Sequence, residues 1–108
     1  MVYWFSLAGA ILLEVAGTTS MKLSHGFTRT VPSVLLFVFY ALSFTLMTIA
    51  VKKIDMSVSY AIWSGIGTAL IALIGIGWFH ESLTPLKLVS LALIVAGVLG
   101  LNAGVRDI

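Results

Sequence analysis

The sequence predicts an all-α integral membrane protein with four transmembrane helices in a single domain, residues 1–108. The chain is 60% hydrophobic and only 9% charged, whereas soluble domains carry roughly 25% charged residues. Four continuous apolar segments are each long enough to cross a bilayer, which takes about 20 residues of helix. Because the polar joints between these segments are too short to hold a soluble domain, we expect almost the whole chain to lie within the membrane.

The first span is expected near residues 2–21 and is interpreted as a retained helix rather than a signal peptide. It has no basic region ahead of its apolar residues, and Glu14 interrupts the stretch that would form the hydrophobic part of a leader. A polar joint containing Gly26 and Arg29 follows this span.

The second, third and fourth spans are expected near residues 31–51, 57–79 and 86–103. Pro32 and Pro85 lie at the starts of the second and fourth spans, where a missing N–H does no harm and the fixed φ favours a helix. The apolar runs are continuous rather than alternating, and a helix satisfies its own backbone hydrogen bonds in lipid. We therefore expect helices and not barrel strands.

The composition also excludes several classes of function. The chain has no cysteine and only two histidines, so we expect neither a metal site nor any other cofactor. Its six basic residues are scattered and form no stripe that could follow a phosphate backbone, so nucleic acid is not an expected partner. No span joins a nucleophile to a base and no loop is long enough for an active site, so an enzyme is not expected.

The basic residues of the joints do not select one orientation in the membrane. Positive charge in short loops normally marks the cytoplasmic side. One side of the membrane would carry Lys52, Lys53 and Arg106, and the other Lys22, Arg29 and Lys87. This equal distribution predicts insertion in both orientations, which permits an antiparallel homodimer. The alternative is a single orientation set by a partner or by the N-terminus.

Glu14 is the only acidic residue inside any of the four expected spans. A charged carboxylate in a bilayer costs roughly 2.5 to 3.5 kcal/mol on insertion scales, so such residues usually face a cavity, a partner or a transport path. Because a low-dielectric surrounding disfavours the charged form, the group can hold a proton or release it to bind a cation. The sequence thus predicts a site shared by protons and cations. The alternative is a protonated Glu14 that only bonds two helices together.

Small and aromatic residues surround this position on the expected helix faces. The helical spacing of three and four residues places Ala10, Gly17 and Thr18 on the face of Glu14. Candidates on the second and third spans are Tyr40, Ser43, Tyr60 and Trp63, with Ser64 on the same face of the third span. Aromatic ring faces attract organic cations, and Trp does so best. Lipid packing is the alternative for Trp63, and an interfacial belt is the leading interpretation for Trp4, which could also line the pocket.

Small residues in the third and fourth spans predict two further roles. Gly65 and Gly67 interrupt the third span beside Trp63, where they permit either a hinge for alternating access or ordinary close packing. The fourth span carries small residues at spacings of four and seven, typical of close helix–helix packing. We assign these residues to the dimer interface: Ser90, Gly97, Gly100 and Gly104.

Three runs of the sequence resemble those of the small multidrug resistance transporters. They are E-V-A-G-T-T at residues 14–19, K-L-S-H-G-F-T-R-T-V-P-S at 22–33 and Y-A-I-W-S-G-I-G at 60–67. The resemblance covers all four spans at nearly the same length. It implies a multi-pass protein of a bacterial inner membrane whose partners are membrane lipid, protons, organic cations and an antiparallel copy of itself.

The resemblance also implies a mechanism and a pocket. The two Glu14 side chains of a dual-topology dimer would bind either protons or a cationic substrate, with the site open to each side in turn. Carried over by position, the pocket residues would be Tyr40, Ser43, Tyr60 and Trp63.

Within this family, the small residues 16–18 after Glu14 are similar to those of the quaternary ammonium and multidrug branch. Guanidinium exporters tend to carry a bulky Trp soon after the glutamate. We therefore expect proton-coupled export of lipophilic or quaternary ammonium cations. The alternatives are a selective guanidinium exporter and an accessory membrane subunit that transports nothing alone. Two positions depart from the multidrug pattern, because Trp4 replaces a typical Tyr and Ser90 a frequent Gly.

Overall fold

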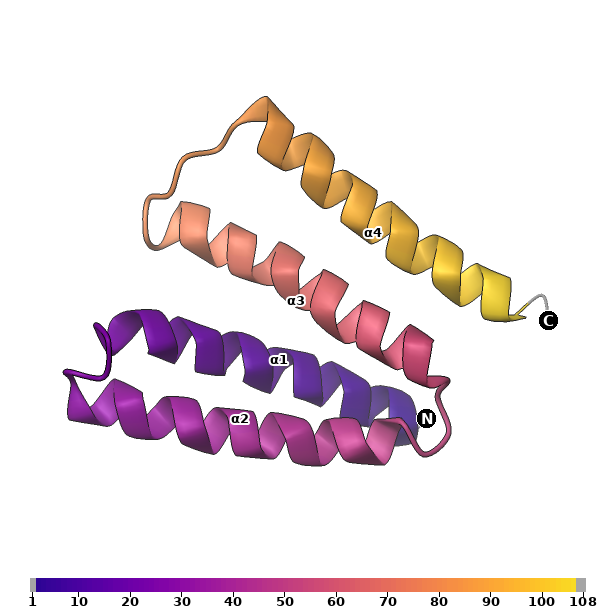
Figure 1. The fold of residues 1–108 in the computed structure, drawn as a ribbon, viewed down its shortest axis with the longest axis horizontal. Coiled ribbons are helices and arrows are strands. Elements are labelled where there is room, and N and C mark those ends of the chain that lie inside the picture. The colour runs from indigo at the N-terminus through magenta and orange to yellow at the C-terminus, as the bar shows by residue number, and fades with distance from the viewer. Residues whose placement is uncertain (1, 107–108) are drawn as a thin grey trace.

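The computed structural model describes residues 2–106, which fold into four α-helices. These are α1 (Val2–Leu23), α2 (Thr30–Ala50), α3 (Met56–Gly77) and α4 (Pro85–Arg106) (Figure 1). All four are long and apolar enough to cross a membrane, and residues 2–106 contain no strand. The all-α fold class with four transmembrane helices is confirmed, and the chain is a multi-pass membrane protein.

The helix ends differ from the expected spans by a few residues because turn geometry, not hydropathy, ends a helix. α1 continues to Leu23 and stops where His25, Gly26 and Phe27 take positive φ values of 48°, 70° and 69°. α3 ends at Gly77, shortly before His80, whose φ is 57°. A residue in this left-handed region cannot continue a right-handed helix.

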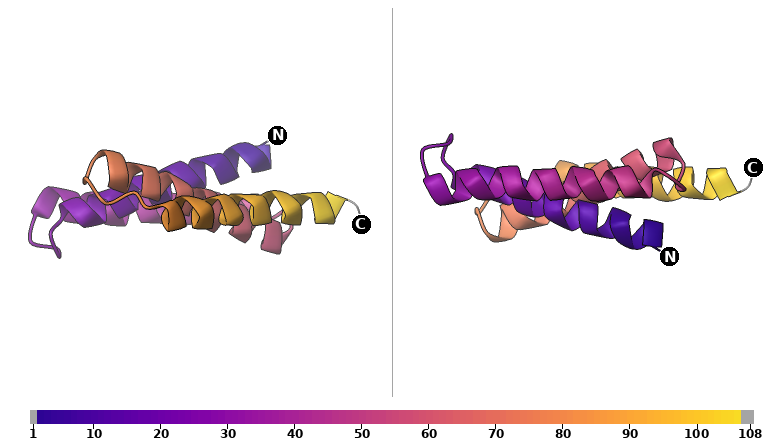
Figure 2. Two further views of the ribbon diagram at one scale, coloured as in Figure 1. Left: turned by 90° about the horizontal axis from the view of Figure 1, so that it is seen from above. Right: turned by 90° about the horizontal axis from the view of Figure 1, so that it is seen from below.

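The helices lie side by side in one layer, in the order α2, α1, α3, α4 (Figure 1). Their Cα atoms span 48 × 35 × 17 Å, and the views from above and below show how thin the layer is (Figure 2). α1 and α3 run in the same direction, and α2 and α4 run against them (Figure 1). α4 packs chiefly on α3. Within residues 2–106, both faces of the layer therefore stay uncovered.

The tightest packing joins α1 to α2 and α3. The cluster of buried apolar side chains consists of Leu7, Ile11, Val15, Ala50, Ile54 and Val58. Ser43 adds a polar contact, because its Oγ donates to the backbone oxygen of Ala10 at 2.6 Å, and both residues are 0% exposed. In α4, by contrast, Val98 is the only buried residue among positions 85–104. The first three helices thus form the body of the subunit, and α4 lies at its edge.

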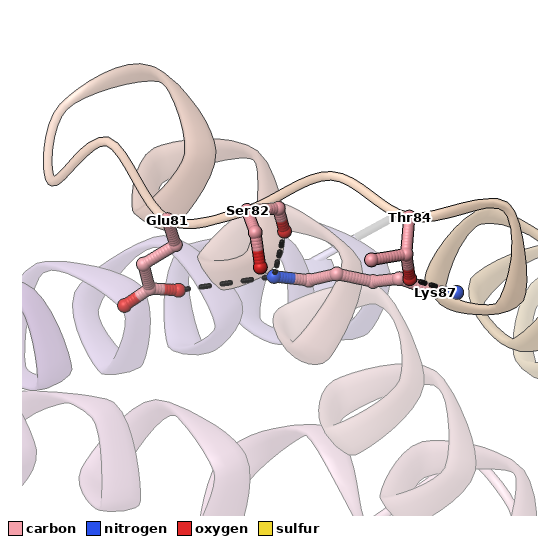
Figure 3. Close-up of polar contacts among 4 residues, drawn as sticks. All are labelled: Glu81, Ser82, Thr84 and Lys87. Carbon is pink, nitrogen blue, oxygen red and sulfur yellow. Dashed lines mark hydrogen bonds and ion pairs between the residues drawn. The ribbon is translucent and has the colours of Figure 1, made fainter.

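The turn between α3 and α4 is built from polar contacts (Figure 3). Thr84 caps α4, since its Oγ1 accepts the backbone N–H of Lys87 at 3.1 Å. The Lys87 ammonium donates to the Ser82 backbone oxygen at 3.3 Å and lies 3.9 Å from Glu81 Oε1. These contacts link Lys87 to the turn that carries Glu81.

Candidate functional site

Glu14 lies on α1 and is hydrogen-bonded to a threonine one helical turn further along. Thr18 Oγ1 donates to Glu14 Oε1 at 2.8 Å, and the same hydroxyl lies 2.7 Å from the Tyr40 hydroxyl of α2. A hydroxyl has only one proton to donate. Because the Thr18 hydroxyl donates its one proton to Glu14, the Tyr40 hydroxyl must donate to Thr18. The three groups form a directed chain that ends at the carboxylate.

Two glycines make room for this arrangement. A Cβ at Gly17 would lie 2.8 Å from Tyr40 Cδ1, so the tyrosine ring can reach Thr18 only because residue 17 has no side chain. A Cβ at Gly67 would lie 3.1 Å from Glu14 Oε2. Gly67 thus allows the carboxylate to lie close against α3. The residues beside Glu14 are small because an aromatic ring and a carboxylate occupy the space.

The carboxylate opens into a cavity of ≈ 270 Å³ between α1 and α3. Glu14, Thr18, Trp63 and Gly67 line it together with Ser64, Thr68 and Ile71. Of the last three, Ser64 was expected on the face of Trp63, whereas Thr68 and Ile71 were not predicted as site residues. Ser64, Thr68 and Ile71 are spaced by four and three residues, so the helical periodicity of α3 was the signal that could have found them.

A row of aromatic rings runs from α2 to α3 beside this cavity. Tyr40 stacks on Phe44 with ring centroids 6.2 Å apart, and Phe44 meets Trp63 edge-on at 6.2 Å. Trp63 in turn meets Tyr60 edge-on at 5.6 Å. The sequence interpretation missed Phe44, although it lies one turn after Tyr40 on the same helix face. Trp63 Nε1 is buried and has no hydrogen-bond partner among the described residues.

The other predicted pocket residues lie outside the cavity of this subunit. Ala10 and Ser43 are fully buried where α1 meets α2, and the Ser43 hydroxyl already bonds the backbone of α1. Tyr60 ends the aromatic row and is 60% exposed, and Trp4 is 43% exposed near the start of α1. Neither of these two aromatic residues lines the cavity. Their direct contact with a substrate stays a prediction.

The predicted hinge and dimer residues also have defined positions. α3 is continuous through Gly65 and Gly67, and a Cβ at Gly65 would lie 2.5 Å from Val98 Cγ2 of α4. Gly65 thus serves close packing, and the hinge stays a prediction. The proposed dimer residues are all exposed: Ser90, Gly97, Gly100 and Gly104. A Cβ at any of these three glycines would meet nothing within 4 Å, so no other described residue covers this face of α4.

Comparison with known proteins places these features in a family context. Residues 2–94 match the sequence profile of the family described as "Small Multidrug Resistance protein". The chain is also 52% identical over 99 residues to a Bacillus subtilis (strain 168) protein described as "Uncharacterized membrane protein YvaE". That alignment covers 92% of this chain and 83% of the Bacillus protein.

Proposed function

The chain belongs to the small multidrug resistance family and is a membrane transporter, and from this premise we propose that it exports lipophilic or quaternary ammonium cations in exchange for protons. The observation that carries the proposal is the Glu14 carboxylate, bonded by Thr18 at 2.8 Å, which opens into a cavity beside Trp63. A carboxylate and an aromatic ring are the two groups that attract an organic cation without N–H donors. No catalytic activity is proposed.

The exchange follows from competition for one carboxylate. When Glu14 is charged, it attracts the cation, while the Trp63 ring contacts the cation's apolar surface. When Glu14 takes up a proton, the charge that holds the cation disappears and the cation leaves. The Thr18 hydroxyl donates to the carboxylate that both ligands share. Proton and cation therefore cannot both be held at this carboxylate, and uptake of one accompanies release of the other.

An antiparallel homodimer in the cell inner membrane would supply the rest of the site. The single helix layer leaves both faces of the subunit uncovered (Figure 2), and a second copy is the simplest cover for the cavity. The free small-residue face of α4 provides a surface for close helix contact. The even distribution of loop charges supports opposite orientations of the two copies.

The hydrogen-bonding pattern favours quaternary cations over guanidinium. The Ser64 and Thr68 hydroxyls donate to backbone oxygens of their own helix, at 2.7 and 2.6 Å. Glu14 is thus the only charged acceptor on the cavity wall, whereas a guanidinium group presents five N–H donors. The binding and exchange experiment below distinguishes this proposal from the two alternatives, a guanidinium exporter and an accessory subunit.

The test is substrate binding and exchange by the purified protein. We expect the native chain to bind tetraphenylphosphonium with release of protons, and its affinity to fall as pH is lowered because protons compete for Glu14. Glu14→Gln should abolish proton release and high-affinity binding. Glu14→Asp should keep some binding but change its pH dependence.

Trp63→Ala should weaken the binding of aromatic cations by about five- to thirty-fold, which corresponds to the loss of one buried cation–π contact.

The outcomes separate the candidate functions. Proton movement driven only by guanidinium would assign the protein to the guanidinium exporters. Tight, pH-independent binding by Glu14→Gln, or binding by the native chain without proton release, would overturn the exchange mechanism. A native chain that binds and transports none of these cations would favour the accessory subunit.

A further inference from the structure

A second, larger cavity of ≈ 590 Å³ lies at the end of the subunit that holds the α1–α2 and α3–α4 turns. Its charged, titratable and aromatic side chains are those of Lys22, His25, Phe79 and Glu81. Thr18 and Ile71 line both this cavity and the one at Glu14, so the two spaces are neighbours. The larger cavity therefore lies between the Glu14 site and the end of the membrane-spanning layer.

The electrostatics of helix ends favour positive charge in this second cavity. α1 and α3 run in the same direction (Figure 1), and the last turns of both contribute to its lining. Each helix C-terminus carries the equivalent of about half a negative charge. Two such ends converge here. An anion would be repelled from this position, and a cation would be attracted.

A carboxylate adds to this negative potential. The backbone N–H of Glu81 donates to the Gly75 oxygen at 2.9 Å, which folds the turn back over the end of α3. The carboxylate then lies directly on Gly75, where a Cβ would come within 2.8 Å of Glu81 Cδ. Lys87 is the nearest basic partner, at 3.9 Å, in a pair whose side chains are 31% and 47% exposed (Figure 3). Such an exposed and loose ion pair holds its carboxylate weakly.

A tethered cation already occupies the aromatic part of the cavity. The Lys22 ammonium lies 5.8 Å from the centroid of the Phe79 ring, a distance at which a ring face attracts positive charge. The cavity thus repeats the chemistry of the inner site, a carboxylate with an aromatic ring. Lys22 marks where a positive group is stabilised.

We propose that the second cavity is an outer cation subsite, in which Glu81 and Phe79 hold the organic cation on its way to or from Glu14. This inference rests on the proposed function for its ligand class, lipophilic or quaternary ammonium cations. Lys22 competes with the ligand for the Phe79 ring and keeps the subsite weak. A weak outer site lets the cation leave after Glu14 has released it.

Two glycines at the end of α3 provide a matched test that leaves the charged side chains of the second cavity in place. Gly75→Ala would push the Glu81 carboxylate out of the cavity, and because this is the end of a flexible side chain, the helix can remain intact. Gly77→Ala is the control, since a Cβ there meets nothing within 4 Å. Both changes are made in Glu14→Gln protein in lipid nanodiscs, so that binding at the inner carboxylate is absent.

Tetraphenylphosphonium is the probe, with affinity measured by titration and binding located by NMR shifts of the Gly26 and Gly75 amides. We expect weak, salt-sensitive binding in Glu14→Gln, and a further loss of about three- to ten-fold with Gly75→Ala or Glu81→Gln, as for one partly exposed charge contact. Gly77→Ala should have no effect. Lys22→Gln should tighten binding, because it removes the tethered competitor.

The subsite is overturned if Glu14→Gln protein shows no residual binding, or if Gly75→Ala and Gly77→Ala bind the probe equally. Neither result affects the proposed function, which is judged by Glu14-dependent exchange in the native chain. Conversely, Glu81-dependent binding in a protein that exchanges nothing would retain the subsite and overturn the transport proposal.

Discussion

At the scale of single residues, the central feature is the hydrogen-bond chain from Tyr40 through Thr18 to Glu14. Its two links measure 2.7 and 2.8 Å and connect α2 to α1. We propose that Thr18 is a positioning residue, whose hydroxyl holds the Glu14 carboxylate in place. Thr19 offers a natural comparison, because its hydroxyl bonds only the Val15 backbone oxygen of its own helix, at 2.8 Å.

We predict that Thr18→Val weakens cation binding at fixed pH by about ten-fold, the cost of removing one hydrogen bond to a charged group. The carboxylate loses the donor that holds it in place, so it is less well positioned to meet the cation. Titration with tetraphenylphosphonium across pH checks this. Thr19→Val is the matched control and should bind as the native chain does. Equal affinities in the two variants would show that the hydrogen bond has no part in binding.

Ser43 illustrates how one residue's role depends on its surroundings. Its hydroxyl bonds the Ala10 oxygen and is fully buried, so in this subunit it stabilises the contact of α1 with α2. We predict that Ser43→Ala lowers the free energy of unfolding by about 1 kcal/mol, because one buried hydrogen bond is lost. Its effect on cation affinity should be smaller. Thermal unfolding and probe titration of the same variant check the two effects. A large loss of affinity at unchanged stability would contradict this assignment.

At the scale of helices, α3 and α4 use glycine in two different ways. Gly65 lies against Val98, so its lack of a side chain permits packing within the subunit. Gly97 faces open space and lies on the exposed side of α4, as does Leu93 one turn earlier. The absence of a side chain at Gly65 lets α3 and α4 pack closely, whereas Gly97 leaves an exposed surface on α4.

We predict that Gly97→Leu weakens dimerisation more than Leu93→Ala does, because a bulky side chain on the small-residue face separates the two backbones. Helix content should stay unchanged, since a Cβ at this position meets nothing within 4 Å. Crosslinking yields in membranes and circular dichroism check the two statements. Equal yields for both variants would argue for a different interface.

At the scale of the whole molecule, the subunit is a thin layer of four helices whose ends carry balanced charge. The described residues leave both faces of the layer uncovered (Figures 1 and 2). Lys52 and Lys53 lie in the α2–α3 turn, and Lys22 and Arg29 near the α1–α2 turn at the opposite end. The proposed antiparallel homodimer requires insertion in both orientations, with two opposed copies that cover each other.

We predict dual topology, so a reporter fused after Ile108 should signal from both sides of the membrane. Adding two lysines to the α1–α2 turn or to the α2–α3 turn should bias insertion in opposite directions. Both variants should lose activity, because matched antiparallel partners become scarce. Co-expression of the two should restore it. A native reporter confined to one side would exclude this assembly.

The sequence by itself determined the number and approximate position of the helices, the lone acid of the spans and the family. These are local properties, because hydropathy and charge along a chain decide where a segment meets lipid. Helical periodicity also indicated the face that carries Glu14 and Thr18.

Only the tertiary structure decided which of these faces meet. Periodicity gives the direction of a side chain on its own helix but not the neighbour that it contacts. That neighbour depends on helix order and on small residues such as Gly17 and Gly75, which admit the Tyr40 ring and the Glu81 carboxylate. For this reason the Ser43 hydroxyl bonds the α1 backbone, and Phe44 is part of the aromatic row. The second cavity likewise forms where the ends of α1 and α3 lie together.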